Sequence, residues 1–335
     1  MSETSRFLIL LTGLTLLVVV LFAVSLLIGP ASLTLVQSIN ALFSGQGDSD
    51  AVVLVMREIR LPRALLALLI GASLGLSGAA LQGYLRNPLA EPGLLGVSAS
   101  ASLGAVIAIY TGLSVVFPLA LPLLALVGAF MSVFLVKALA GQHAGTLAVI
   151  LAGVAVTSFA GALTALALNL SPNPYAAMEI VFWMLGSLAD RSMTHVALAA
   201  PFIIVGWIML LSLGRSLDSL TLGADAAASM GVNLSRVQIL AIVGTAACVG
   251  ASTAIAGAIG FVGLVVPHLL RPLVGARPSR LLIVSAFGGA ALLLAADVAV
   301  RVLMPGRELK LGVLTALVGA PFFLWLVFKY RRRLV

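Results

Sequence analysis

Long apolar segments alternate with short polar turns along the whole chain. Glycine, proline and charged residues bound the apolar runs, most of which are close to the roughly 20 residues that a helix needs to cross a bilayer. Residues 7–28 are apolar on every face, whereas the strands of a membrane barrel alternate polar and apolar positions. The pattern therefore predicts an all-α polytopic protein that crosses a membrane about ten times. The predicted segments are 7–28, 61–85, 94–112, 117–140, 145–169, 195–213, 235–255, 258–271, 281–303 and 309–329.

Composition agrees with this pattern and excludes a water-soluble globule. Hydrophobic residues make up 61% of the chain, charged residues only 9%, and the mean hydropathy is +1.21. A soluble domain carries about a quarter charged residues, so this chain lacks the polar surface that water would require. The first apolar run has no basic leader and no small-residue cleavage site, which predicts an uncleaved first helix. We expect one transmembrane domain over residues 1–335.

The net charge of +8 is distributed as in a membrane protein and does not indicate nucleic-acid binding. If both termini are cytoplasmic, twelve of the 19 Lys and Arg residues fall on inner segments and seven on outer ones. This excess of inner positive charge favours cytoplasmic termini. The seven outer residues need a separate explanation. They are Arg57, Arg60, Arg63, Arg191, Arg301, Arg307 and Lys310.

Side chains that could carry out catalysis are scarce. The histidines His143, His195 and His268 lie in three different segments without the spacing of a metal site. A phosphate-binding loop needs Gly-Lys-Ser/Thr, and none of the three lysines is followed by Ser or Thr. We therefore expect no catalytic residue, no metal and no cofactor in this chain. If the protein pumps, another subunit supplies the energy.

Asp297 is the one carboxylate deep within an apolar run. Charge inside a membrane is costly and is usually paired or functional. Arg301 follows one helical turn later, at the spacing where two side chains on a helix meet. A paired structural charge is favoured over a proton relay, because no second buried carboxylate is near in the sequence.

The connection at residues 214–236 contains a short helical pattern outside the predicted spans. "ADAAASM" is framed by Gly223 and Gly231, and Asp225 near its start complements the helix dipole. A helix with small residues on its surface suits docking into a groove of another protein. A simple surface linker helix explains the residues equally well.

Three stretches together identify a family. The chain resembles the permease subunits of type II ABC importers, which take up cobalamin, ferric siderophores and haem into bacteria. The matching stretches are "IRLPRALLALLIGASLGLSGAALQGYLRNPLAEPGLLGVS" (59–98), "GAIGFVGLVVPHLLRPLVG" (257–275) and "ELKLGVLTALVGAPFFLWLVFK" (308–329). The resemblance implies ten spans with cytoplasmic termini in the bacterial inner membrane. It also implies a second copy of the chain, two cytoplasmic ATPase subunits that hold ATP and Mg, and a periplasmic binding protein.

The resemblance also assigns residues to these partners. In the family, periplasmic arginines of the permease meet glutamates of the binding protein, and Arg60, Arg63 and Arg301 match those positions. Arg301 cannot fully serve both Asp297 and a docking glutamate. "LTLGADAAASMGV" (220–232) matches the family's ATPase-coupling segment, within 214–236. The expected coupling residues are Leu222, Gly223, Asp225, Ala226, Ala227, Met230 and Gly231.

The stretch "RNPLAEPG" interrupts the apolar pattern between the second and third spans. Two prolines four residues apart cannot both lie inside one regular helix. On the resemblance we expect a rigid cytoplasmic turn next to the pathway helices, where Asn87 and Glu91 accept backbone N–H groups. A direct contact with the ATPase or a role in a cytoplasmic gate is the alternative. The residues of this predicted turn are Asn87, Pro88, Glu91, Pro92 and Gly93.

Three functions from different classes remain to be compared. The first is an importer permease for a bulky metal chelate, with a ferric siderophore or haem ahead of cobalamin as family priors. The second is a secondary transporter driven by an ion gradient, for which only Asp297 qualifies as a buried acidic residue. The third is a membrane enzyme, which would need a pair of reactive polar residues at depth. The residues favour the first.

Overall fold

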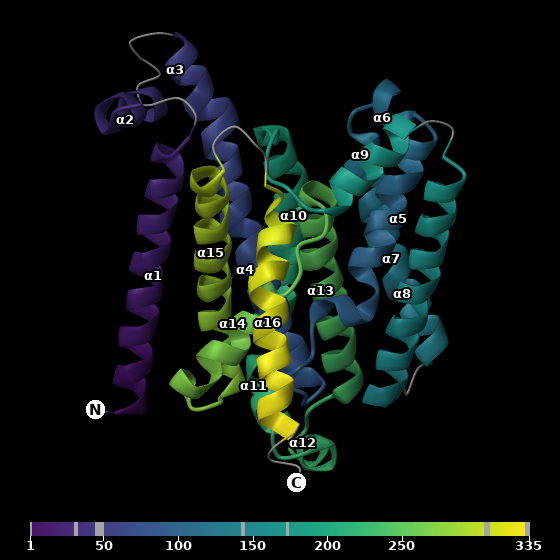
Figure 1. Ribbon diagram of the computed structural model, residues 1–335. Coiled ribbons are helices and arrows are strands. Elements are labelled where there is room, and N and C mark those ends of the chain that lie inside the picture. Colours follow the sequence, from purple (N-terminus) through teal and green to yellow (C-terminus); the bar gives the residue numbers. More distant parts are fainter. Residues whose placement is uncertain are drawn as a thin grey trace.

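The computed structural model describes residues 2–29, 33–43, 50–141, 145–171, 174–304 and 309–331, and these form a bundle of helices without a strand among them (Figure 1). Within these ranges eight helices are long and apolar enough to cross a membrane. They are α1 (Glu3–Leu27), the continuous helix Asp50–Tyr84 that includes α3 (Asp50–Leu54), η1 (Val55–Arg60) and α4 (Leu61–Tyr84), then α7 (Ala120–Ala140), α8 (Thr146–Asn169), α10 (Met193–Leu211), α13 (Leu234–Ala256), α15 (Pro278–Leu303) and α16 (Leu311–Arg331).

Two of the predicted segments form shorter apolar helices. They are α5 (Val97–Tyr110), which lies in the third segment, and α14 (Val262–Leu270), which continues into the 3₁₀ turn η3 (Arg271–Val274) and lies in the eighth. The all-α prediction is confirmed, whereas the number of crossings stays a prediction. The remaining short helices are α2 (Leu35–Phe43), η2 (Pro92–Leu95), α6 (Leu113–Val116), α9 (Pro174–Met184), α11 (Gly214–Leu220) and α12 (Ala224–Ser229).

Both ends of the chain lie at one end of the bundle. Figure 1 shows that α1 begins and α16 finishes at the end that carries α12, whereas α2, α3 and α6 lie at the opposite end. We call these the α12 end and the α2 end. Termini on one side agree with an even number of crossings.

The centre of the bundle consists of α4 and α13, whose most apolar windows are each 83% buried. Small residues make this possible. Gly71 and Gly75 of α4 place their backbones directly against Ser285 and Gly289 of α15, where an added Cβ would meet a carbonyl oxygen. In a bilayer such close approach of helices is the main source of packing energy. The small-residue runs in the sequence therefore mark the central contacts of the bundle.

The proline-containing turn after α4 has two parts that lie at different depths in the bundle. Its first part lies at the α12 end, but its second part enters the bundle and α5 begins only at Val97. Pro92 lies next to Gly263, where an added Cβ would be 2.7 Å from the proline Cδ, and Leu94 contacts Gly153, two turns into α8. Glycines on two neighbouring helices leave room for this backbone between them. The cytoplasmic location of the turn stays a prediction.

The connection at 214–236 holds two helices instead of one. The predicted helix is present as α12, and it is flanked by Gly223 with φ +112° and Gly231 with φ +85°. L-residues with a side chain rarely adopt such angles, so both glycines are required by the backbone. The sequence pattern did not predict α11, which precedes α12 and packs against α15.

Candidate functional sites at the two ends of the bundle

A charge cluster at the α2 end is centred on Asp297, whose side chain is completely buried. One carboxylate oxygen is 2.8 Å from an Nη of Arg63 and 2.9 Å from its Nε. The other oxygen is 2.8 Å from an Nη of Arg301. The predicted pair of Asp297 and Arg301 is therefore present. Arg63, which lies 234 residues away in sequence, completes a three-residue ion network.

Arg60 and Arg301 also bind the C-terminal end of α1. Arg60 donates to the carbonyl oxygens of Leu26 and Leu27 at 2.9 and 2.8 Å. Arg301 donates to the carbonyls of Ser25 and Ile28 and to the Ser25 hydroxyl. The last carbonyls of a helix lack partners within the helix and carry its negative dipole end. The two guanidinium groups satisfy these carbonyls and hold α1 to α4 and α15.

The same arrangement explains two further outer arginines. Arg57 donates to the carbonyls of Ala41 and Leu42 in the last turn of α2. Arg191 donates to the carbonyl of Ile255 at the end of α13. Four arginines at this end, Arg57, Arg60, Arg191 and Arg301, therefore bind carbonyls at helix C-termini. Arg307, the remaining outer arginine, lies outside the described residues.

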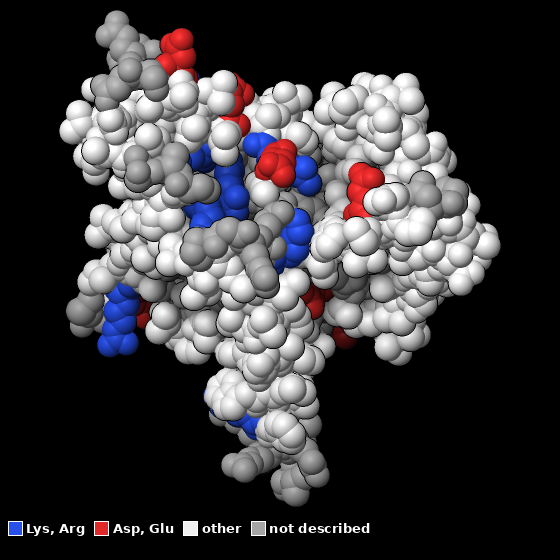
Figure 2. Space-filling model, turned by 45° about the horizontal axis from the view of Figure 1, so that its top comes forward, with Lys and Arg blue, Asp and Glu red and all other residues white. Residues whose placement is uncertain are grey.

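The cluster retains positive charge after these internal contacts. Arg60, Arg63 and Arg301 together carry three positive charges and Asp297 carries one negative charge, which leaves two positive charges in excess. Figure 2 shows Lys and Arg atoms gathered in a hollow in the middle of this face, with Asp and Glu beside it. Arg60 is buried, whereas Arg63 and Arg301 are partly exposed. The structure brings the three predicted docking arginines together, and their docking role stays a prediction.

At the α12 end, α12 and its flanking residues present large apolar side chains to the outside. Leu222 is 67% exposed and Met230 is 62% exposed, and Asp225 and Ala226 are exposed as well. Ala227 is fully buried against the chain's own core, so its side chain fastens the segment to the bundle. The predicted coupling residues thus form an anchored segment with an exposed apolar surface.

Asp218 of α11 connects this segment to α15, a contact that the sequence pattern did not predict. Its carboxylate accepts from the backbone N–H of Ser279 at 2.8 Å and from Arg277 at 3.1 Å. An acidic side chain at this place caps the N-terminus of α15. Arg301 lies on the same helix, and the stretch of α15 from Ser279 to Arg301 spans about 33 Å at 1.5 Å per residue. This helix therefore connects the α12 end with the charge cluster.

The turn between α4 and α5 is fastened by the two acceptors that the sequence predicted. Asn87 Oδ1 accepts from the N–H of Leu89 at 2.9 Å. Glu91 Oε1 accepts from the N–H of Phe261 at 2.8 Å, at the start of α14. Phe261 has a left-handed backbone (φ +67°), and its side chain packs on Gly319 of α16. Glu91 therefore connects the turn to α14 and, through Phe261, to α16.

The histidines within the described ranges have structural contacts. His195 completes the cap at the start of α10 with Ser192, and the ring of His268 packs edge-on against Phe322. Among described residues no group of three His, Cys, Asp or Glu side chains could hold a metal ion. His143 lies outside the described residues.

Comparison with known proteins accounts for nearly the whole chain. The sequence profile of the FecCD transport family matches residues 16–329. The chain is 42% identical over 277 residues to the Fe(3+) dicitrate transport system permease protein FecD of Escherichia coli (strain K12), covering 83% of this chain and 86% of that protein. It is 38% identical over 295 residues to the hemin transport system permease protein HmuU of Yersinia pestis, covering 85% and 86%.

A third relative and a solved structure extend the comparison. The vitamin B12 import system permease protein BtuC of Klebsiella pneumoniae is 38% identical over 325 residues, covering 96% of this chain and 94% of that protein. The solved structure is an "inward-facing conformation" of a "metal-chelate type ABC transporter". It has a TM-score of 0.84 and 35% identity, and covers 95% of this chain and 98% of its own.

Proposed function

This chain belongs to the FecCD transport family of ABC importer permeases, and on that premise we propose that it forms the pathway of an ATP-driven importer for a bulky metal chelate. Two copies assemble in a bacterial inner membrane with two ATPases and a periplasmic binding protein. The proposal rests on the family match over residues 16–329. It is supported by relatives that are named as permeases for iron dicitrate, hemin and vitamin B12. A ferric siderophore or haem is the preferred substrate, followed by cobalamin.

The α12 end receives the ATPase in this proposal. Exposed Leu222 and Met230 provide the apolar surface that a helix needs to dock into a groove. Closure of the ATPase dimer moves α12, and the contact of Asp218 with the N-terminus of α15 passes the movement into the bundle.

The α2 end receives the binding protein. The two positive charges in excess at the charge cluster complement acidic side chains on a partner, which orients its approach and raises its association rate. Arg63 and Arg301 are partly exposed, so an acidic side chain can reach them while the hydrogen bonds to the C-terminal end of α1 stay in place.

The ion-gradient alternative is weakened by the surroundings of Asp297. A proton relay requires the carboxyl group to gain and lose a proton during transport. Here both carboxylate oxygens face arginines at 2.8 Å, so protonation would leave Arg63 and Arg301 without their counter-charge.

The experiment that tests the proposal is uptake into proteoliposomes that contain the permease, the ATPase and the binding protein encoded beside it. Labelled haem, a ferric siderophore and cobalamin are offered in parallel. We expect ATP-dependent accumulation of one of them, lost in Met230→Lys because a charge is placed on the docking surface. Leu273→Lys, at another exposed leucine near the α12 end, is the control and retains uptake. Uptake without the ATPase, driven by an ion gradient, would contradict the proposal.

A further inference from the structure

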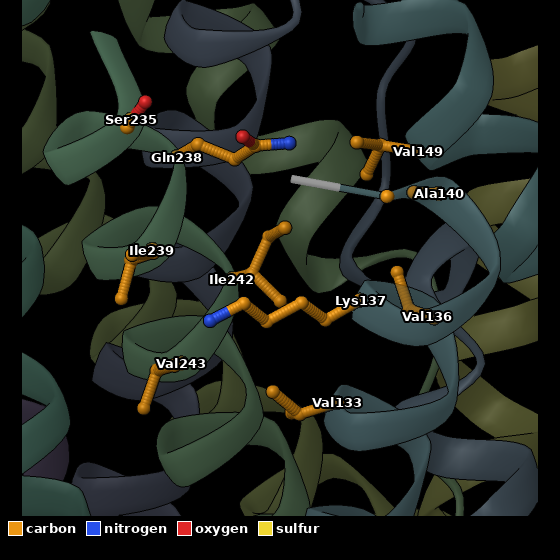
Figure 3. A pocket seen from close by; sticks show the side chains of 11 residues that line it. Val133, Val136, Lys137, Ala140, Val149, Ser235, Gln238, Ile239, Ile242 and Val243 are labelled. Atoms are coloured by element: carbon orange, nitrogen blue, oxygen red, sulfur yellow. The ribbon is translucent and has the colours of Figure 1, made fainter. Parts of the chain in front are cut away.

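A cavity of about 300 Å³ lies between α7 and α13 near the α12 end (Figure 3). Its walls are mostly aliphatic. Val133 and Val136 of α7 face Ile239, Ile242 and Val243 of α13 across the space. None of the contacts described above for the α2 end, the coupling segment or the turn uses this cavity.

Polar groups enter the cavity at three points. Lys137 and Gln238 extend into the space from opposite walls, and Ser235 lies in the first turn of α13 (Figure 3). Among the described residues that line the cavity, Lys137 alone is charged. In the part of the chain that the structure describes, its ammonium group has no ion pair and no hydrogen bond. Lys137 is exposed, so its ammonium group is accessible to an anion that approaches the open side of the cavity.

The cavity lies where two candidate membrane spans, α7 and α13, have their ends. Lys137 lies in the last turn of α7, which ends at Ala140, and Ser235 lies in the first turn of α13. Deeper along α7 an exposed apolar stripe leads away from Lys137. Its residues are Phe134, Met131 and Val127, spaced three or four positions apart on one helix face. The cavity is therefore polar beside Lys137, and α7 carries exposed apolar side chains further along the helix.

We propose that this cavity binds an anionic phospholipid. The phosphate pairs with Lys137 and accepts hydrogen bonds from Gln238 and Ser235, and an acyl chain lies along the aliphatic wall formed by Val133 and Val243. An anionic phospholipid has a charged headgroup at the membrane boundary and hydrocarbon chains below it. The cavity matches this arrangement, with one cation and two polar donors at one end and apolar walls beside them. The inference needs the chain to span a membrane and does not depend on its substrate.

Native mass spectrometry of the full-length permease in dodecyl maltoside tests this binding. Dioleoylphosphatidylglycerol and dioleoylphosphatidylcholine are titrated in parallel, and the fraction of protein that retains lipid is measured. We expect tighter binding of phosphatidylglycerol, and Lys137→Ala should weaken it about fivefold, the effect of one basic residue on an anionic lipid. Lys137→Arg retains the binding. The control is Lys329→Ala, a lysine at the same end that stacks on Trp325.

A second measurement needs no variant. Acetylation of lysines by an amine-reactive reagent is followed residue by residue, and phosphatidylglycerol should protect Lys137 but leave Lys329 reactive. Inorganic phosphate at the same concentration should give no protection. Equal protection by phosphate would show a site for a free anion and overturn the proposal. Binding of phosphatidylglycerol that is unchanged in Lys137→Ala, or no tighter than that of phosphatidylcholine, would also overturn it. Import can proceed in either case, so this test is separate from that of the proposed function.

Discussion

The substitution Asp297→Asn removes the carboxylate that two arginines share, without changing the size of the side chain. Asp297 is completely buried and its two ion pairs measure 2.8 Å. Removal of one partner from a buried pair typically costs 3–5 kcal/mol, because the remaining charge is left uncompensated. Arg301 keeps its bonds to the end of α1 and Arg63 is partly exposed, so we expect the lower end, about 3 kcal/mol.

The assay is the free energy of unfolding in mixed micelles as the fraction of sodium dodecyl sulfate is raised. Asp225→Asn makes the same chemical change at an exposed position of α12 and should alter the unfolding free energy by no more than about 0.5 kcal/mol. The double variant Asp297→Asn with Arg63→Gln should lower the free energy of unfolding by less than the sum of the losses in the two single variants. The coupling energy should be about 1 kcal/mol or more, as for residues in one charge network.

The reasoning fails if Asp297→Asn unfolds with the same free energy as the unchanged protein. If stability is unchanged but uptake is lost, Asp297 acts in transport itself, and the ion-gradient alternative is favoured again.

The same variant, Asp297→Asn, raises the net charge of the cluster from two positive charges to three. We therefore expect association with an acidic binding protein to be at least as fast as before, which stopped-flow mixing at low salt measures.

Three further predictions concern the turn, the centre and the coupling segment. Glu91→Ala leaves the N–H of Phe261, the residue before α14, without an acceptor and should lower the unfolding free energy by about 1–3 kcal/mol in mixed micelles. Glu91→Gln keeps an acceptor oxygen and should recover most of this loss. Gly75→Ala places a methyl group against the carbonyl of Ser285 and should cost about 1–3 kcal/mol in the same assay. Gly161 on α8 has open space around an added Cβ, so Gly161→Ala should leave the unfolding free energy unchanged or raise it. Equal losses of unfolding free energy at the two glycines would refute the packing argument. Asp218→Ala removes the cap of α15 and should reduce uptake per ATP hydrolysed, measured together in proteoliposomes, and unchanged coupling would exclude this route.

The sequence determined the class of the protein and the approximate place of every long helix. In a bilayer all backbone polar groups must be paired within a segment, so an apolar run of about 20 residues has few alternatives to a helix. Local spacing also determined local contacts. The pair of Asp297 and Arg301 follows from their separation by four positions, and α12 follows from its small residues between Gly223 and Gly231.

The site at the α2 end could be predicted only in part. The family motif identified Arg60 and Arg63, but no local signal shows that Arg63 reaches Asp297 or that Arg60 binds the end of α1. Ser25 was missed for the same reason. These contacts join residues that are 33 to 276 positions apart in the chain, and they depend on how α1, α4 and α15 pack.

The tertiary structure alone decided the path of the turn that contains Glu91. Its prolines predict a break in the helix, but its depth depends on Gly153 and Gly263, which leave space on two other helices. The partner of Glu91, Phe261, lies 170 residues further on. Hydrophobicity and backbone pairing act within a segment and can be deduced from it, whereas close packing of helices depends on pairs of surfaces that meet only in the folded bundle.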